Sequence, residues 1–334
     1  MAGDETYVEI DGRRVRISSP GKVMFPARGW TKLDLVEHYL TCRTGALRGV
    51  QGRPTVLKRF DKGVDEEPVF QKRARTSDPK HELVTVRFPS GRSADLFVPR
   101  HAADVVWLAQ QNCVDLNPWP VRAGDVDHPD ELRIDLDPTP GVDFADVRRV
   151  AVEVRAVFGE HGLVGWPKTS GNRGIHVYAR IEPEWSFTEV RRAALALGRE
   201  VARRRPQIAT TAWWKEERDG VFLDYNQNAR DRTIASAYSV RHTGLVSAPL
   251  RWDEVPDVDP RDFALDTFPQ RWSAVGDLTE GIDEAVGRLD GLLELARQDE
   301  EGGLGDAPWP PHFPKREGEP DRVQPSRRRK APPG

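Results

Sequence analysis

Residues 131–140, ELRIDLDPTP, carry the pattern on which the predicted fold and site depend. Apolar and charged side chains alternate along this stretch, which is the period-2 pattern of a half-buried strand. Pro138 and Pro140 end the strand, because a proline cannot donate a hydrogen bond to the sheet. Since successive side chains of a strand point to opposite faces, Asp135 and Asp137 are predicted to lie on the same face.

Two carboxylates this close do not both stay ionised readily unless a cation lies between them. Oxygen ligands of this kind suit Mg²⁺ or Mn²⁺. A third acid, Asp224, lies in the apolar run VFLDY of residues 221–225, where a carboxylate needs a partner or a cation. Three convergent carboxylates can hold two divalent ions about 3.5–4 Å apart. The alternatives are a solvent-exposed strand face for the pair and a salt bridge to a nearby arginine for Asp224.

The segment 168–176, KTSGNRGIH, offers the opposite chemistry. Gly171 and Gly174 allow a ligand to approach the backbone, and the N–H groups of such a turn can bind an anion. Donors suited to phosphate oxygens come from Lys168, Ser170 and Arg173. His176 follows in a predicted strand, where a lone histidine is more often structural. The sequence thus combines acidic residues that could bind a metal ion with basic residues that could bind phosphate. Together they predict a polyphosphate substrate, most simply a nucleotide.

The composition places limits on the class of protein. The 334 residues carry a net charge of -3, but residues 48–100 hold 12 Lys+Arg against 7 Asp+Glu, and residues 251–306 hold 5 against 16. Any nucleic-acid-binding surface would therefore be confined to a part of the protein where positive charge exceeds negative charge. No apolar run approaches the ~18 residues of a membrane span, and no signal peptide is visible. Cys42 and Cys113 are expected to be reduced and buried. These features indicate a cytoplasmic protein without a membrane partner.

Hydrophobic periodicity and capping residues predict one α+β domain over residues 1–300, with mixed or antiparallel sheets flanked by helices. A hairpin is expected at residues 7–17, and helices are expected after the capping boxes that begin at Thr31 and Ser186. From residue 301 to 334 the Pro- and Arg-rich sequence predicts an extended or disordered tail.

Four further elements are predicted less directly. Asp143 is expected to cap a helix, residues 166–174 to form a polar turn, residues 233–238 a strand, and residues 279–297 the last helix. The helix after Ser186 carries arginines on one face, which indicates either a solvated surface or part of a groove. These arginines are Arg191, Arg192, Arg199, Arg203 and Arg204.

Three stretches together resemble the polymerase domain of bacterial ligase D, a member of the archaeo-eukaryotic primase superfamily. They are LRIDLDPTPGVDFADV, KTSGNRGIHVY and FLDYNQNARDRTIASAYSVR. The resemblance extends upstream to GKVMFPARGWTKLDLVEHYL and RPTVLKRFDKGVDEEPVFQKR, and downstream to SAPLRW. It covers roughly residues 18–290 in the same order, and the tail is similar to those of free-standing members.

This resemblance implies a primase-like polymerase fold and a template-dependent nucleotidyltransferase of non-homologous end joining that uses two Mn²⁺ ions. By position, Asp135, Asp137 and Asp224 match the catalytic, metal-binding carboxylates. Residues matching those that contact the incoming NTP or dNTP are Lys58, Phe70, Ser170, Arg173, His176, Gln227 and Arg241. Phe70 matches the aromatic that stacks on the base. Lys22 and Lys32 fall where relatives bind the 5′-phosphate or backbone of DNA.

Two departures from the family pattern stand out. Asn117 replaces a histidine that normally serves the nucleotide site, and an asparagine cannot become cationic. Arg173 replaces a lysine, which keeps the charge but changes the donor geometry. The first departure supports an alternative, a non-catalytic DNA-end-binding protein on the same fold. A second alternative is an aspartyl-phosphate phosphatase, since Asp135 to Thr139 fits D-x-D-x-T.

The resemblance also suggests partners for the chain. The segment that starts at Lys215, KEERDG, does not fit the Lys-x-Asp-Gly adenylation motif. A separate DNA ligase is therefore expected to seal the nick, and a Ku homologue is the expected partner at the DNA end.

Overall fold

A six-stranded mixed sheet forms the centre of the computed structural model, which describes residues 4–73 and 81–315. Its strands are β10 (Glu131–Pro138), β11 (Trp166–Thr169), β12 (Ile175–Ile181), β13 (Ala209–Thr210), β14 (Val221–Leu223) and β15 (Val286–Gly287). The order is β11-β12-β10-β14-β13, with β15 beside β12. Strand β10 pairs antiparallel with both neighbours, whereas β13–β14 and β12–β15 are parallel pairs. The predicted α+β fold with mixed sheets is confirmed.

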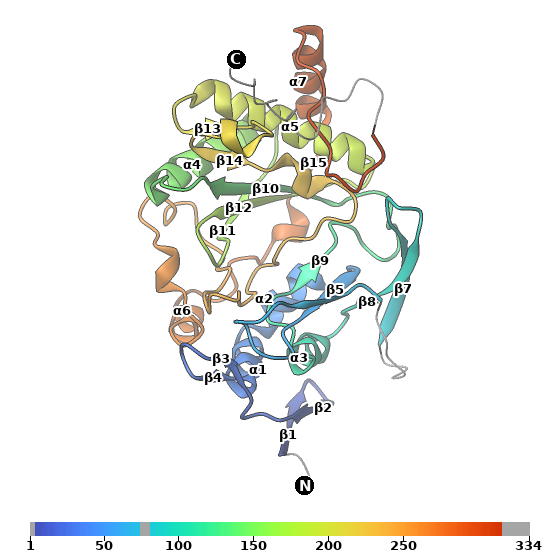
Figure 1. The fold of residues 1–334 in the computed structure, drawn as a ribbon, viewed down its shortest axis with the longest axis vertical. Helices are drawn as coiled ribbons and strands as arrows, with labels where there is room; N and C mark the ends of the chain where they lie inside the picture. Colours follow the sequence, from blue (N-terminus) through green and yellow to red (C-terminus); the bar gives the residue numbers. More distant parts are fainter. Residues whose placement is uncertain (1–3, 74–80, 316–334) are drawn as a thin grey trace, which may run out of the picture.

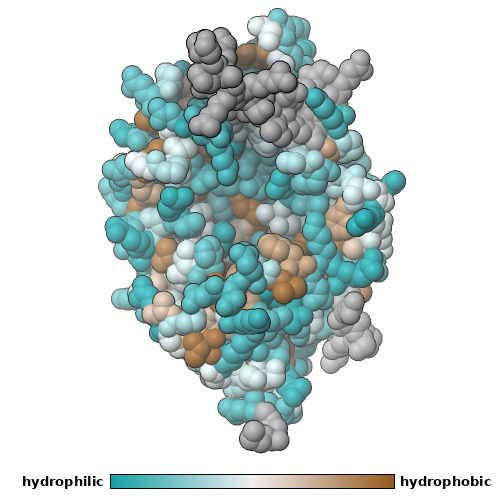
Figure 2. All heavy atoms as spheres, viewed as in Figure 1, coloured by the Kyte–Doolittle hydropathy of each residue, from teal (hydrophilic) through white to brown (hydrophobic). Residues whose placement is uncertain are grey.

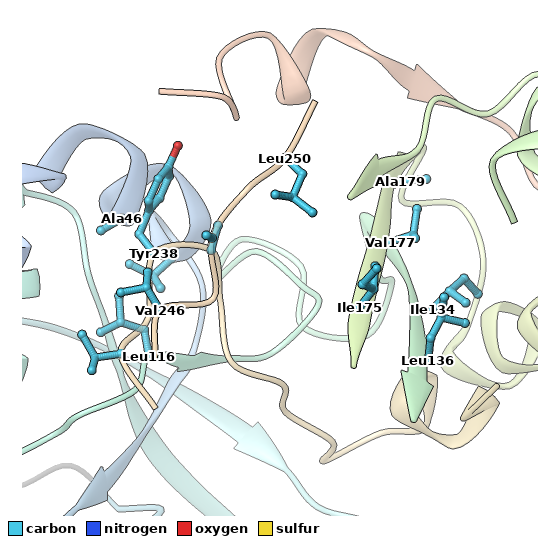
Figure 3. Close-up of a cluster of buried hydrophobic side chains, with 14 of the residues drawn as sticks. Ala46, Leu116, Ile134, Leu136, Ile175, Val177, Ala179, Tyr238, Val246 and Leu250 are labelled. Carbon is cyan, nitrogen blue, oxygen red and sulfur yellow. The ribbon is translucent and has the colours of Figure 1, made fainter. Parts of the chain in front are cut away.

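Two long helices, α4 (Phe144–Glu160) and α5 (Phe187–Arg204), pack against the central sheet and each other (Figure 1). Helix α4 begins after Asp143, whose side chain accepts a hydrogen bond from the N–H of Ala145, and α5 begins with the predicted capping box at Ser186. Apolar side chains of the sheet, including Ile134 and Val177, are buried in the core shown in Figure 3. The polar residues of these strands are therefore left on the opposite face.

That opposite face is turned toward a second, five-stranded sheet with its own helices (Figure 1). Its strands are β5 (Thr55–Arg59), β6 (Val69–Gln71), β7 (Glu82–Arg87), β8 (Ser93–Val98) and β9 (Asn117–Pro118). The accompanying elements are β1 (Glu5–Ile10), β2 (Arg13–Ser18), β3 (Val23–Phe25), β4 (Trp30–Thr31), α1 (Lys32–Thr41), α2 (Arg43–Val50) and α3 (Ala102–Gln110). One cluster of buried apolar residues includes members from both halves, so the two sheets share a core.

The C-terminal part adds α6 (Phe268–Val275), α7 (Asp290–Glu301) and the 3₁₀ helices η1 (Lys215–Glu217), η2 (Tyr225–Asn228), η3 (Pro260–Asp262) and η4 (Ile282–Glu284). After α7 the chain turns back and buries Trp309, which is 1% exposed. Residues 316–334, including SRRRK, lie outside the described residues. Figure 2 shows a mostly hydrophilic face on which apolar residues form small separate groups.

The predicted hairpin and both capping boxes are confirmed, and Cys42 and Cys113 are free and buried. No helix in the described part of the chain is both long and apolar enough to cross a membrane.

Three predictions of local structure were wrong. Residues 166–169 form strand β11 instead of a turn. Residues 233–238 form no strand, because Ser236 and Tyr238 donate their N–H groups to the loop carbonyls of Leu116 and Ser247. The last helix begins at Asp290 instead of 279, because Gly281 adopts a φ of 84° that is unsuited to a helix.

The five predicted arginines of α5 form ion pairs or hydrogen bonds within the fold. Arg204 pairs with Glu160 of α4, and the other four bind the C-terminal part of the chain. Arg191 is 1% exposed, and its neighbours bind α7 and the segment that follows it. Arg192 pairs with Glu300, Arg203 with Asp299, and Arg199 donates to the carbonyl oxygen of Gly305. This face of α5 therefore holds the C-terminal part of the chain.

Candidate active site

Four polar side chains form a row across the central sheet. Asp135 of β10 is paired with His176 of β12, and His176 with Lys168 of β11. On the other side, Asp224 directly follows β14 and donates its N–H to the carbonyl oxygen of Asp135 at 3.0 Å. Directly opposed residues of neighbouring strands have Cβ atoms about 4.5–5.5 Å apart, so the row places these side chains in reach of one another.

Lys168 and His176 orient one oxygen of Asp135. The Lys168 Nζ lies 2.6 Å from His176 Nδ1, and His176 Nε2 lies 3.3 Å from Asp135 Oδ1. Burial lowers the pKa of Lys168, but its Nζ meets three partners, and the Ser247 hydroxyl among them already donates to Thr169 O. An ammonium has the three N–H groups that this arrangement needs, so Nδ1 accepts and Nε2 carries the proton that faces Asp135. Lys168 also donates to Ala235 O at 2.8 Å and Ser247 Oγ at 2.7 Å. Burial lowers the pKa of His176, which keeps the imidazole a neutral donor.

Asp224 is joined to Asp135 through a side-chain amide. Gln227 Nε2 lies 3.1 Å from Asp224 Oδ2 and 3.3 Å from Asp135 Oδ2. The other Asp224 oxygen accepts the N–H of Asn226 at 3.0 Å, as the N-cap of η2. Gln227, predicted to contact a nucleotide, thus bridges two of the predicted catalytic carboxylates.

The pKa values of the three carboxylates are raised, although Asp137 is exposed and Asp135 and Asp224 are only partly buried. Burial raises the pKa of Asp135 to about 6, and burial together with the charge of Asp135 raises the pKa of Asp224 to about 6. Burial and Asp135 also raise the pKa of Asp137, against the opposing charge of Arg173. Within residues 4–73 and 81–315, none of the three forms an ion pair with a lysine or arginine. The salt-bridge alternative for Asp224 therefore finds no support in the described residues.

The donor set suits a divalent cation. Among the described residues, no three His, Cys, Asp or Glu side chains already converge closely enough to hold an ion. Instead, the amide of Gln227 supplies the partial positive charge between Asp135 and Asp224. Three carboxylates whose charged forms are disfavoured are the oxygen ligands that Mg²⁺ or Mn²⁺ prefers, and a cation among them would lower all three pKa values.

The predicted phosphate turn packs against a second turn at residues 241–245. Gly171 has a φ of 69°, and a Cβ there would lie 2.4 Å from Arg241 Cγ. Arg241 Nη1 donates to Ser170 O at 2.9 Å, and Thr243 Oγ1 donates to Gly171 O at 2.7 Å. The hydroxyl of Ser170 accepts two N–H groups of its own turn, which fixes the shape of that turn.

A buried acid that was not predicted, Asp115, connects the cations of the two halves. Its Oδ2 lies 3.1 Å from Lys58 Nζ of β5 and 3.5 Å from Arg241 Nε. Lys58 in turn lies 5.9 Å from the centre of the Phe70 ring, which is 59% exposed. Phe70 borders a groove of about 820 Å³ that is also lined by Lys72 and other cationic and aromatic side chains. The predicted nucleotide contacts Lys58, Phe70 and Arg241 therefore form one group.

The remaining predicted residues lie as follows. Asn117 is buried, and its Nδ2 donates to the carbonyl oxygen of Asp115 at 3.2 Å. Lys22 Nζ donates to Asp61 O at 2.5 Å. Lys32 is buried with its ammonium on the carbonyl oxygens of Ser18 and Gln110, and burial followed by the charge of Lys22 lowers its pKa. Lys22 and Lys32 are thus neighbours in a second basic group.

Sequence reasoning missed the roles of two residues. Lys168 was predicted as a phosphate donor, whereas its Nζ is committed to His176 and two other acceptors. Asp115 lies in the apolar run CVDL, so the argument that singled out Asp224 would have found it as well. Only the tertiary structure identifies its partners, because they are distant in the sequence.

Comparisons with known proteins agree with this geometry. The model of the LigD primase-polymerase domain family matches residues 31–279. The multifunctional non-homologous end joining protein LigD of Mycolicibacterium smegmatis is 32% identical over 312 residues, covering 90% of this chain and 40% of that protein. Its counterpart in Pseudomonas aeruginosa is 29% identical over 262 residues, covering 77% of this chain and 31% of that protein.

A solved structure, the polymerase domain of Mycobacterium tuberculosis ligase D in complex with DNA, aligns with a TM-score of 0.75 and 30% identity. The alignment covers 81% of this chain and 98% of that one. The fold is thus that of a primase-like polymerase. The chain belongs to the LigD primase-polymerase domain family. It spans about 40% of the length of the M. smegmatis relative.

Proposed function

We propose that this protein is a DNA-directed nucleotidyltransferase that adds NTPs or dNTPs to 3′ ends during gap filling in bacterial non-homologous end joining. The observation that carries the proposal is a group of three carboxylates with raised pKa values, the partly buried Asp135 and Asp224 and the exposed Asp137. None of them forms an ion pair with a lysine or arginine of the described residues. Membership of the LigD primase-polymerase family supports it, as does the likeness to a polymerase domain solved with DNA.

In this proposal the three carboxylates hold two Mn²⁺ or Mg²⁺ ions. When bound, such ions lower the pKa of an attacking 3′-hydroxyl and neutralise the triphosphate and the leaving pyrophosphate. His176 keeps one oxygen of Asp135 in a fixed direction through its Nε2–H. The amide of Gln227, which donates to Asp135 and Asp224, would be free to turn toward the nucleotide if these carboxylates held an ion instead.

The nucleotide is proposed to lie between the two halves of the molecule. Lys58 and Arg241, which meet at Asp115, supply positive charge for the phosphates, and Arg173, near Asp137, adds a third cation. The turn at Ser170, whose shape is fixed by its own hydrogen bonds, lies against Arg241. The exposed ring of Phe70 provides the stacking surface for a base.

The DNA substrate is proposed to be a gapped or overhanging end with a 5′-phosphate, bound near Lys22 and Lys32. Between these two, Lys22 is the more accessible phosphate ligand, because Lys32 is buried. The proposed partners are a Ku homologue and a separate DNA ligase, and the proposed location is the cytoplasm, at the nucleoid.

The test is Mn²⁺-dependent addition of NTP to a gapped duplex by the wild type, by Asp137→Ala and by Asp253→Ala, a control at an acid whose side chain is 77% exposed. We expect addition by the wild type and the control only. Equal activity of Asp137→Ala would contradict the proposal. Release of phosphate from small esters without nucleotide addition would instead support the phosphatase alternative.

Asn117 favours the second candidate, a DNA-end-binding protein without catalysis. Its amide is committed to the carbonyl oxygen of Asp115 and cannot carry the charge of the family's histidine. Tight binding of 5′-phosphorylated DNA by a wild type that adds no nucleotide would establish that candidate.

A further inference from the structure

The segment that follows α7 turns back onto helix α5 and the 3₁₀ helix η2, which directly follows Asp224. Residues 306–309 pack against α5, with Ala307 9% and Trp309 1% exposed. The ring of Trp309 lies 4.1 Å from the guanidinium of Arg191, and the ring of Tyr225 lies 5.1 Å from it. The sequence predicts an extended or disordered tail from residue 301, and residues 307–309 lie outside any helix or strand but are buried.

Arg191 holds this segment with nearly all of its donors. Its Nη1 donates to Asp306 Oδ1 at 2.7 Å, and its Nη2 donates to the carbonyl oxygens of Ala307 at 2.8 Å and Pro308 at 3.0 Å. Its Nε donates to Asn226 Oδ1 at 2.7 Å. A planar guanidinium with fixed donor directions determines where each of these acceptors lies.

Asn226 transmits this arrangement to the active site. Its side chain accepts from Arg191, and its Nδ2 donates to Pro308 O at 3.2 Å. Its backbone N–H donates to Asp224 Oδ1 at 3.0 Å, and this hydrogen bond opposes the rise in the pKa of Asp224. Asn226 is 3% exposed, so these contacts are not shared with solvent.

We infer that residues 306–309 position the carboxylate of Asp224, so that this segment contributes to the geometry of the active site. The segment fixes Arg191, Arg191 fixes Asn226, and the N–H of Asn226 fixes the carboxylate. This inference rests on the proposed function in one respect, that Asp224 is a ligand of the divalent ion. It adds that the loss of residues 306–309 disturbs the ion site by displacing Asp224.

The physical reason is that Asp224 has few fixed partners. Besides the N–H of Asn226, its described hydrogen-bond donor is the side-chain amide of Gln227, which is only partly buried. Partners that orient a metal ligand typically change metal affinity or activity by about 10–100-fold when removed. Removing the contacts of the segment should therefore weaken ion binding.

Two acids of the C-terminal part provide a matched pair of variants. Asp306 pairs with Arg191 and its side chain is 40% exposed, whereas Glu300 pairs with Arg192 and its side chain is 47% exposed. Both bind neighbouring arginines of α5, but only the first pair continues to Asn226. We compare Asp306→Ala with Glu300→Ala in the full-length protein.

The first measurement is Mn²⁺ affinity, read from the electron paramagnetic resonance signal of free Mn²⁺ without nucleotide or DNA. We expect Asp306→Ala to weaken Mn²⁺ binding about 10-fold or more and Glu300→Ala to leave it within about two-fold of the wild type. The second measurement is nucleotide addition, in which Asp306→Ala should lower kcat while the KM for the nucleotide stays unchanged.

Equal Mn²⁺ affinity and equal kcat for the two variants would overturn the inference. If the unfolding midpoint of Asp306→Ala falls so far that the protein is not folded, Asp306→Asn, which keeps the volume of the side chain, decides by the same comparison. A wild type that binds Mn²⁺ but adds no nucleotide would defeat the proposed function alone, because the Mn²⁺ comparison would still stand.

Discussion

Two acids on strand β10 lie four residues apart on the same face, yet their surroundings are opposite. Glu131 is paired with Arg180 at 2.5 Å and with Arg133 at 2.8 Å, and Arg53 lies 3.8 Å away. Asp135 faces only the neutral donors of His176 and Gln227 at ion-pair or hydrogen-bond distance within the described residues.

The pKa values express this difference. Burial by itself would raise the pKa of Glu131, but the three arginines outweigh it and hold the pKa well below the usual range. For Asp135 burial prevails, and its pKa rises to about 6. A buried carboxylate that is paired with several arginines contributes to the fold. A carboxylate that has only neutral donors keeps its affinity for a cation.

The largest expected effect is a loss of stability on substitution of Glu131, the acid that is paired with arginines. Glu131→Gln should lower the free energy of unfolding by about 3–5 kcal/mol, because it leaves buried arginines without their counter-charge. Urea unfolding followed by circular dichroism measures this. Glu182→Gln, at a surface acid that pairs with Arg288, is the control and should change the value by about 0.5 kcal/mol or less. Similar losses for both variants would remove the distinction between the two kinds of acid.

The second effect is a loss of activity on substitution of Asp135, the acid that is not paired with arginines. In free energy it is smaller than the effect expected for Glu131. Asp135→Asn should lower kcat for nucleotide addition by about 100-fold or more, because it removes the charge of a proposed metal ligand. Its free energy of unfolding without metal should be unchanged or higher, since the folded state disfavours the charged carboxylate. Primer extension and urea unfolding on one preparation test both parts. A large loss of stability would place Asp135 in the same class as Glu131.

The smallest effect is on the pH dependence of stability. The pKa of Asp224 is about 6 in the folded state, above its usual value, so the folded state binds this proton more tightly than the unfolded state. Its contribution to stability is therefore greatest near pH 4 and is lost as the pH rises through about 6. We expect a loss on the order of 1 kcal/mol, discounted for partial solvent contact, in EDTA.

Asp224→Asn is the reference for that measurement, because asparagine does not titrate. The difference between the wild-type and variant unfolding free energies should decrease from pH 4.5 to 6.5. Glu131 has the opposite sign, since its lowered pKa makes its contribution present above its usual pKa and lost only in more acidic solution. Parallel curves for wild type and Asp224→Asn would show that Asp224 carries no raised pKa.

Much of the site could be predicted from local sequence. The alternation around Asp135 and Asp137 placed both on one face of a strand, and the apolar run around Asp224 marked it as a carboxylate in need of a partner. The ordered motifs then predicted the family, which the comparisons confirm. The helix boundaries followed where a capping box was present, as at Thr31 and Ser186.

What could not be predicted depends on partners distant in the sequence. The Asp115 link to Lys58 and Arg241 joins three separate segments. The last helix was extended too far because apolar spacing continues before Asp290, while Gly281 breaks the helix through its backbone conformation. The absence of a strand at 233–238 follows from hydrogen bonds to loops, which no local pattern reports.

The sequence by itself determined the face and the charge of Asp135 and Asp137, because strand periodicity and residue type fix both. Only the tertiary structure decided which charges are left unsatisfied. Glu131 and Asp135 share a strand, a face and a charge, and they differ in whether arginines from elsewhere in the fold reach them. Coulombic interactions between distant segments depend on distance in space, and that distance is set by packing and not by sequence spacing.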